Sequence, residues 1–398
     1  MSATVRVLIL SLASVSVAFA GGCAKLLGIS DPIAGDGGKV DGDGNLLHDA
    51  ADPDAMIDSS IDAPPPCTTS NAFGTELSFD VGAVATGFAV GKLDALATLD
   101  VAIAVGTQVV ILHGDGAGNF GTPTIIDTAA TGVVIGDFDP TDGRKDLVLW
   151  SGDQVVARRQ TPSPGAAGTF LAAQPLSGPF TNVTNVLVEQ FSGPSAVDLL
   201  IQDDVDRRVY TQLNTAGTFS RENLTIGAVG DDLLLVQQIN NALDADVALV
   251  DQAGNVKLSL NTSGGLQPVT TIATGATGHA AAFGKFDGDA LLDLVIATSA
   301  GGVVFAQNPG APGTFTQVPG TIPGIIGNTL FVSDINQDGT DDVVVPGSVV
   351  LQCPGTPGVF SQVESVNATA PVLLVDLDGN GKPDLLRLEG TALKVRMQ

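Results

Sequence analysis

Basic residues are scarce in this 398-residue sequence, which has 17 Lys and Arg against 43 Asp and Glu and a net charge of −26. That balance argues against nucleic acid or an anionic membrane surface as a partner, because both are themselves negatively charged. Reactive and aromatic side chains are also few: one Trp, one Tyr, and three each of His, Cys and Met. Neither Gly-x-Ser-x-Gly nor His-Glu-x-x-His occurs, so these signatures of serine hydrolases and zinc proteases are absent.

Glycine, by contrast, is abundant at 49 residues, and Val and Leu are common while Lys is rare. This composition favours many short strands joined by turns over helices. We therefore expect an all-β fold.

The N-terminus has the pattern of an export signal over residues 1–22. Arg6 supplies the positive charge, and Val7–Ala20 is an apolar run that is too short for a convincing membrane span. Ala20-Gly21-Gly22-Cys23 is similar to a bacterial lipoprotein box, in which Cys23 would carry the lipid, although Ala stands where Leu is usual. Ala18-Phe19-Ala20 fits an ordinary secretory cleavage site instead. The expected location is a bacterial membrane, with the chain held by its lipid anchor on the periplasmic or surface face of the outer membrane, and secretion is the alternative.

Residues 23–70 form an Asp- and Pro-rich segment without an apolar period, and Pro64-Pro65-Pro66 lies near its end. A segment of this composition cannot bury a core, so we expect a disordered tether. Asp41–Asp49 imitates a calcium loop, but no strand pattern surrounds it and a solvated linker is the simpler interpretation.

The most informative stretch is Asp376-Leu-Asp-Gly-Asn-Gly-Lys-Pro-Asp384. It places oxygen-bearing side chains at positions 1, 3, 5 and 9, and its glycines permit a tight turn. Carboxylates this close repel one another unless a cation lies between them, and an all-oxygen donor set suits Ca²⁺. The alternative is a polar turn whose first Asp caps backbone amides.

Related loops recur seven times, each ending in an Asp followed by an apolar strand, with steps of 42 to 52 residues. This is the size of a four-stranded propeller blade. The final aspartates are Asp100, Asp146, Asp198, Asp246, Asp293, Asp342 and Asp384.

A Gly-x-Phe turn follows in five repeats, and its Phe is expected to fill the gap between neighbouring sheets. These turns are Gly118–Phe120, Gly168–Phe170, Gly217–Phe219, Gly313–Phe315 and Gly358–Phe360. The seventh repeat stops at Gln398, and residues 73–81 read as its missing outer strand. Pairing of 73–81 with 392–397 would close the array and remove its open edges.

The acidic loop, the strand after it and the Gly-x-Phe turn together resemble the FG-GAP/VCBS repeats of integrin-α-like propellers, over residues 71–398. The resemblance implies a seven-bladed β-propeller with structural Ca²⁺ in the loop between the first two strands of a blade. Closure would also bring Cys67 near Cys353, so a disulfide between them is possible, two free thiols being the alternative.

Four loops retain enough oxygen ligands for a metal, so we expect two to four calcium sites. The ligands are Asp376, Asp378, Asn380, the Lys382 carbonyl and Asp384 in loop seven; Asp334, Asn336, Asp338, the Thr340 carbonyl and Asp342 in loop six; Asp137, Asp139, Asp142 and Asp146 in loop two; and Asp287, Asp289 and Asp293 in loop five, where Lys285 replaces the first acid. Loops one, three and four retain too few ligands, and we expect no metal there.

The resemblance implies a monomeric, non-catalytic adhesion or scaffold protein that binds a protein or glycan. The alternative is a propeller-based glycan hydrolase or lyase, which would need an acid–base pair or a nucleophile away from the metal loops. His48, His113 and His279 are expected to be incidental, although a channel cluster containing His113 or His279 would favour an enzyme. With only Trp150 and Tyr210 available to stack on sugars, a lectin lacks specific support.

Overall fold

The computed structural model describes residues 73–398, apart from short gaps. The gaps are residues 141, 162–167, 190–196, 204–206, 213–218, 223–225, 227–231, 241–244, 252, 263–264, 273–277, 321, 323–324, 326–329, 346, 354–357 and 365–371. The predicted signal, the tether, Cys23, His48 and Cys67 all lie outside the described residues.

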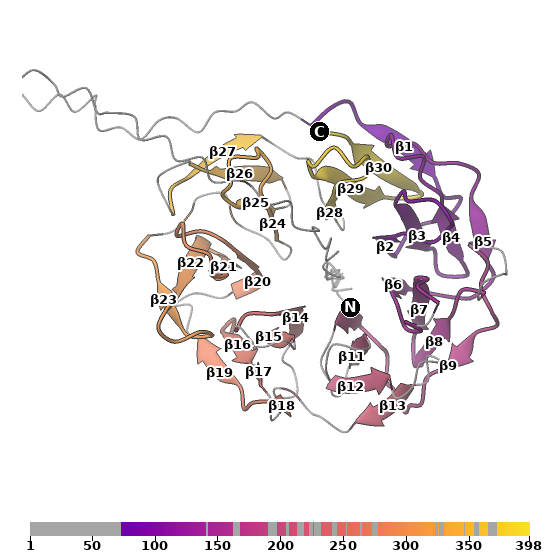
Figure 1. Cartoon of the computed structure of the whole chain (residues 1–398), viewed down its shortest axis with the longest axis horizontal. Coiled ribbons are helices and arrows are strands. Elements are labelled where there is room, and N and C mark those ends of the chain that lie inside the picture. Colours follow the sequence, from indigo (N-terminus) through magenta and orange to yellow (C-terminus); the bar gives the residue numbers. More distant parts are fainter. Residues whose placement is uncertain are drawn as a thin grey trace, which may run out of the picture. The chain divides into compact units, whose positions relative to one another are not determined.

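All secondary-structure elements of the described residues are β-strands, which confirms the all-β expectation. None of these residues forms a helix long and apolar enough to cross a bilayer. Most strands belong to antiparallel sheets of four, in which strands consecutive in sequence are neighbours (Figure 1).

The first half of the described chain contains three such sheets. They are β2 (Gly87–Gly91), β3 (Asp100–Ala104), β4 (Val109–Leu112) and β5 (Thr124–Ile126); β6 (Gly132–Gly136), β7 (Asp146–Ser151), β8 (Gln154–Arg158) and β9 (Gln174–Pro175); and β10 (Asn185–Glu189), β11 (Asp198–Gln202), β12 (Arg207–Gln212) and β13 (Phe219–Glu222).

The second half contains three more, with an extra hairpin in the fourth repeat. They are β14 (Asp232–Gln237), β15 (Asp246–Val250), β16 (Val256–Ser259) and β19 (Thr270–Ile272), with the hairpin β17 (Asn261–Thr262) and β18 (Gly265–Leu266); β20 (Gly278–Gly284), β21 (Asp293–Thr298), β22 (Gly301–Gln307) and β23 (Phe315–Gln317); and β24 (Phe331–Ser333), β25 (Asp342–Val345), β26 (Ser348–Gln352) and β27 (Phe360–Glu364).

The last sheet joins the two ends of the described chain. Its order is β1–β30–β29–β28, where β1 is Leu77–Asp80, β28 is Val372–Val375, β29 is Asp384–Glu389 and β30 is Ala392–Arg396. Leu77 pairs with Val395, and Asp80 pairs with Ala392. The predicted pairing of residues 73–81 with the C-terminal strand is therefore confirmed, over a shorter range.

Side chains around this seam add to the strand pairing. Arg396 donates from Nη2 to the Phe73 carbonyl at 2.8 Å, and its guanidinium lies 5.6 Å from the centre of the Phe73 ring. Arg387 forms a 2.8 Å ion pair with Glu76. Because Arg387 is 8% exposed, this pair is screened less by water than a surface pair.

The hydrophobic cores lie between sheets rather than within them. One cluster joins the first and second sheets, for example through Ile111 and Leu149, and another joins the fifth and sixth. A further cluster joins the last sheet to the first and includes Leu386 and Phe88. In the described residues, each of the seven sheets thus packs its apolar faces against the sheets before and after it, around a common axis (Figure 1).

The Gly-x-Phe phenylalanines fill gaps between sheets, as expected. Phe120 meets Phe79 of β1 edge-on at 4.9 Å between ring centres, and Phe360 lies 5.8 Å from Phe286 of the preceding repeat. The glycine of the turn adopts a positive φ, +81° at Gly313, which side chains other than glycine rarely allow.

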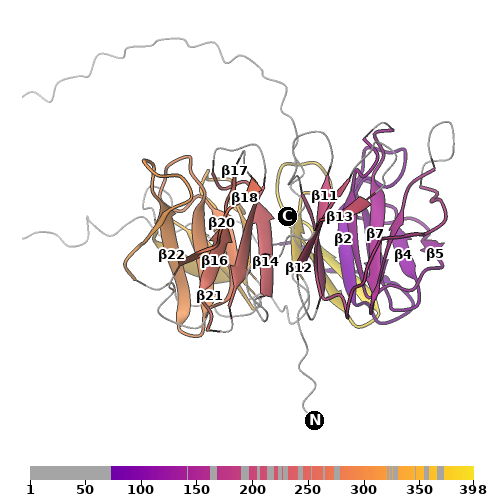
Figure 2. The ribbon, with the colours of Figure 1, turned by 90° about the horizontal axis from the view of Figure 1, so that it is seen from below.

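In the side view the strands run from one edge of the sheets to the other, so the loops between strands lie at these two edges (Figure 2). In every repeat the acidic loop joins the first strand of a sheet to the second, so equivalent repeats place their loops at one end. Contacts between neighbouring loops agree with this arrangement: the Gln337 side chain of loop six donates to the Gly381 carbonyl of loop seven at 2.9 Å.

Candidate metal sites and the groove between two loops

The last aspartate of each loop is fully buried, even in repeats that have lost the other acids. In loops one, two and four to seven, its two oxygens accept backbone N–H groups from two directions. In the fifth repeat, Asp293 Oδ2 accepts from Phe286 at 2.7 Å and Oδ1 accepts from Gln307 at 2.9 Å. In the first, Asp100 accepts from Leu93 at 2.7 Å and Gly114 at 3.0 Å. This residue therefore joins the loop to the end of the third strand.

Burial raises the pKa of these carboxyl groups. The pKa of Asp146 and of Asp342 rises to about 7, mainly because burial disfavours the charged form, while backbone hydrogen bonds act in the opposite direction. For Asp384 the rise has the same main cause, and the nearby carboxylates of Asp378 and Asp376 add to it. A bound cation would lower both the cost of burying the charged carboxylates and the repulsion between them.

A glutamine after the third strand is a second recurring contact, which the sequence analysis missed. Gln160, Gln307 and Gln398 each donate a backbone N–H to the last aspartate of their own loop, 14 residues earlier. The Gln398 side chain also donates to the Ile335 carbonyl of loop six at 2.7 Å. Gln352 makes the same contact with Asp342 at 2.8 Å but only 10 residues after it, so a glutamine at or near the end of the third strand is the signal that could have identified these residues.

The seventh loop brings its predicted acids together. Ligand oxygens of Asp376, Asp378 and Asp384 all lie within 4.8 Å of one another. Asp376 also accepts the backbone N–H groups of Gly379 at 2.7 Å and Gly381 at 2.8 Å, which is the amide-capping geometry of the alternative interpretation. The turn thus brings three carboxylates together, and this all-oxygen set suits a hard cation.

The sixth loop has the same turn but a tighter internal hydrogen-bond network. Asp334 accepts from the Asp338 and Gly339 amides at 3.1 and 2.9 Å, and the Asn336 side chain donates to Asp338 Oδ2 at 2.8 Å. Thr340 donates both its amide and its hydroxyl to Asp338 Oδ1. These bonds link Asp334, Asn336 and Asp338, but the carboxylates of Asp334, Asp338 and Asp342 are not among the described groups whose ligand atoms lie within 4.8 Å of one another, so a cation would have to replace several of these contacts.

A groove of about 480 Å³ lies between loops six and seven. Asp334 and Asp376, the first acids of the two loops, line it together with Gln337, Lys382 and a short apolar wall that includes Leu374. Any ligand in this groove would lie directly against both candidate metal loops.

In the second loop, an arginine side chain contacts one of the predicted ligands. Arg159 contacts Asp139 at 3.2 Å, whereas Asp137 Oδ1 is buried without a hydrogen-bond partner in the structure. Asp142 accepts the Arg144 amide at 2.9 Å. Arg159 would compete with a metal for Asp139, so this loop fits Ca²⁺ less well than the seventh.

In the fifth loop, Asp287 and Asp289 hold turn amides at 3.0 and 2.7 Å. The charge of Lys285 acts on Asp341 of the sixth loop, whose carboxylate also accepts the Lys285 amide at 2.7 Å. Lys285 thus links loop five to loop six.

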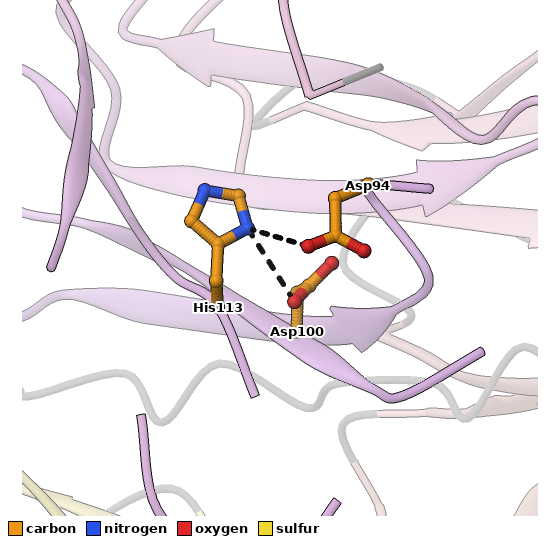
Figure 3. A group of neighbouring side chains, drawn as sticks. All are labelled: Asp94, Asp100 and His113. Atoms are coloured by element: carbon orange, nitrogen blue, oxygen red, sulfur yellow. Dashed lines mark ion pairs between the residues drawn. The ribbon is translucent and has the colours of Figure 1, made fainter. Parts of the chain in front are cut away.

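A second group of ligand atoms within 4.8 Å, in the part of the chain that the structure describes, lies in loop one (Figure 3). It consists of Asp94, Asp100 and His113, a histidine that the sequence analysis treated as incidental. The signal was weak because His113 lies 13 residues beyond the loop, at the end of β4.

Two smaller expectations have structural outcomes. Trp150, one of the two aromatic residues considered for stacking on sugars, is 2% exposed and packs in the core between the second and third sheets. Cys353 is 5% exposed and disulfide-bonded, and its expected partner Cys67 lies outside the described residues.

Residues 285–345 match the sequence profile of the FG-GAP-like repeat. No curated protein matches the chain.

Solved structures share the fold at low identity. A crystal structure of BBS1N in complex with ARL6DN matches over 82% of this chain and 96% of the other, with a TM-score of 0.51 and 14% identity. A lectin from Agrocybe aegerita, solved to explain its recognition of non-reducing terminal N-acetylglucosamine, matches over 75% and 91%, with a TM-score of 0.53 and 16% identity. The described chain is thus a propeller-type all-β structure that contains an FG-GAP-like repeat.

Proposed function

We propose that this chain is a closed, seven-bladed β-propeller that serves as a non-catalytic scaffold for binding a protein or a glycan. The observation that carries the proposal is the pairing of β1 with β30, because it completes the last sheet with a strand from the other end of the described chain and so joins a row of sheets into a ring. Such a ring presents its acidic loops on one rigid face, and loops on a rigid scaffold are common binding sites.

Calcium is the proposed structural ion of this face. Loops six and seven are the first candidates, and loops two and five would bring the number of sites to four. The Kd expected for an extracellular module is about 10⁻⁴–10⁻³ M. With a Kd of about 1 mM, 10 mM Ca²⁺ would add about 1.4 kcal/mol of stability per site.

The groove between loops six and seven is the proposed ligand site. It combines acidic, amide and basic side chains, and it adjoins both metal loops. Of the fold relatives, one is in a complex with ARL6DN and another recognises N-acetylglucosamine, so both ligand classes have a precedent on this fold. Because Trp150 is buried, a sugar would be held by polar groups and metal rather than by stacking on this ring.

We further propose export by residues 1–22 and lipidation of Cys23, with the alternative that the mature chain is secreted. The propeller would then be a monomer attached to the cell envelope through the tether.

The calcium part is tested by thermal melting of the mature chain in 10 mM CaCl₂ and in EDTA. The double variant Asp376→Asn/Asp378→Asn should lose part of the increase in Tm, since it removes two negative ligands of loop seven. Asp115→Asn is the matched control, because Asp115 holds turn amides outside the acidic loops. An equal Tm in calcium and EDTA would refute a structural role for calcium.

The binding part is tested by a pull-down from envelope and secreted proteins and by a glycan array, each with and without chelator. Retention of one partner or glycan class that Lys382→Glu weakens supports the groove. Turnover of a polysaccharide in a substrate panel would instead support the hydrolase or lyase alternative.

A further inference from the structure

His113 faces two carboxylates in the first loop. Its Nδ1 atom lies 3.5 Å from Asp94 Oδ2 and 3.5 Å from Asp100 Oδ1 (Figure 3). The two aspartates come from the loop between β2 and β3, and His113 follows β4. Three ligand atoms from two segments of the chain thus lie within 4.8 Å of one another.

The spacing is too long for direct charge-assisted hydrogen bonds, which measure about 2.7–2.9 Å. His113 Nδ1 is buried and has no hydrogen-bond partner in the structure. Bonds of about 2.0–2.1 Å to a tetrahedral metal separate neighbouring ligand atoms by about 3.4 Å. The observed 3.5 Å separations match the edges of such a tetrahedron.

The other ring nitrogen fixes the orientation of the imidazole. His113 Nε2 lies 2.9 Å from the Thr124 hydroxyl, an interaction that suits an Nε2–H donor. In that tautomer the Nδ1 lone pair faces the two carboxylates, and three acceptors that converge need a cation between them. A hydrogen-bond partner on the ring nitrogen that faces away from the metal is typical of histidines that bind metal.

The other two ligands are also held in place. Asp100 is fully buried and accepts the Leu93 and Gly114 amides, and Asp94 Oδ1 accepts the Leu96 amide at 2.7 Å. The Gly-x-Phe turn of the next repeat covers the site, because a Cβ at Gly168 would lie 3.7 Å from both Asp94 Cβ and His113 Cε1. The side chains of Asp94 and His113 remain 18% and 22% exposed, which leaves the cluster accessible to an ion.

We propose that loop one binds a divalent transition metal of the Zn²⁺ class through His113, Asp94 and Asp100, with a fourth position open to water or a ligand. Two carboxylates balance the charge of a divalent ion. The nitrogen donor and the low ligand number disfavour Ca²⁺, which takes six to eight oxygens. The site is distinct from the proposed calcium loops. Counting ligands within each loop could not find it, because His113 lies outside the loop.

The test is isothermal titration of ZnCl₂ into the mature chain at neutral pH with 2 mM CaCl₂ present. We expect one zinc per chain that calcium does not displace, and at least a 100-fold weaker affinity in His113→Asn. The matched control replaces the other two histidines, His48→Asn/His279→Asn, and should retain the site. Co²⁺ in place of zinc should give the visible absorption of a tetrahedral site, lost in His113→Asn.

A second variant protects the test against misfolding. Asp94→Asn changes a partly exposed ligand without altering its size, and should weaken zinc at least 10-fold while its melting curve stays close to the parent. Absence of stoichiometric zinc binding, or equal binding in His113→Asn and the parent, would overturn the proposal.

Discussion

At the scale of single residues, the buried aspartates have a role that does not depend on metal. Asp246 ends loop four, where few other ligands remain, yet it is fully buried and accepts the Ile239, Asn240 and Asn261 amides at 2.7, 3.0 and 2.6 Å. The aspartate therefore persists where the metal ligands do not, because the turn needs its acceptors.

Asp246→Ala should destabilise the fold by about 3 kcal/mol, because it leaves buried N–H donors unpaired at about 1–3 kcal/mol each. Urea denaturation measures the free energy of unfolding. Asp251→Ala is the matched control in the same repeat: Asp251 also accepts backbone amides, but in a solvent-accessible turn where water can replace it. Equal losses in the two variants would contradict a structural role for the buried position.

The raised pKa of Asp246 predicts a pH dependence. Burial is the main cause and moves the pKa up from 3.8. The folded state then keeps the proton to higher pH than the unfolded state, so this group's contribution to stability is complete below pH 3.8 and declines as the pH rises through its folded pKa.

In EDTA, the stability of the parent should therefore fall more steeply above pH 4 than that of Asp246→Asn, which has no proton to lose. Denaturation midpoints at several pH values give both slopes. A parent slope no steeper than that of the variant would show that hydrogen bonds outweigh burial at this carboxylate.

The sequence identified the acids but not all of their partners. Arg159, which pairs with Asp139, follows a strand 20 residues further along the chain, and nothing local marks it as a counter-ion. His113 was missed for the same reason. Pairs of this kind depend on how strands return across a sheet, which spacing within one loop does not reveal.

At the scale of elements, the strands after the loops were predictable because an Asp followed by an apolar run repeats along the chain. The predicted strand 392–397 coincides with β30 apart from its last residue. Strand ends are less predictable because turn hydrogen bonds, not apolar pattern, decide them.

Close contact between elements explains one glycine. Gly132 on β6 pairs with Trp150 on β7, and a Cβ at 132 would come within 2.0 Å of the indole ring. The ring lies over the glycine and fills the space of its missing side chain.

Gly132→Ala should cost about 2 kcal/mol, within the range for overpacking a core, and should shift the emission of the single tryptophan. Gly310→Ala is the control, since a Cβ there meets nothing within 4 Å. Thermal melts and fluorescence spectra of both variants measure the effect, and an unchanged Gly132→Ala would show that the indole can move aside.

At the scale of the whole molecule, the disulfide of Cys353 is expected to tie the segment before β1 to the sixth sheet. We predict that Cys67→Ser lowers stability by about 3 kcal/mol, because a covalent link restricts the unfolded chain. Reduction of the parent should have the same effect, and Cys23→Ser should have none. Calorimetry measures the change, and mass spectrometry that found the bridge intact in Cys67→Ser would assign Cys23 as the partner.

The seam between β1 and β30 has a consequence for synthesis. A ribosome releases β1 before the other described strands and β30 after them, so this sheet cannot be completed until β30 has been made. A chain that terminates early keeps an unsatisfied β1 and lacks the arginines that hold Phe73 and Glu76. Completion of the seam therefore distinguishes a chain that includes β30 from one that stops before it.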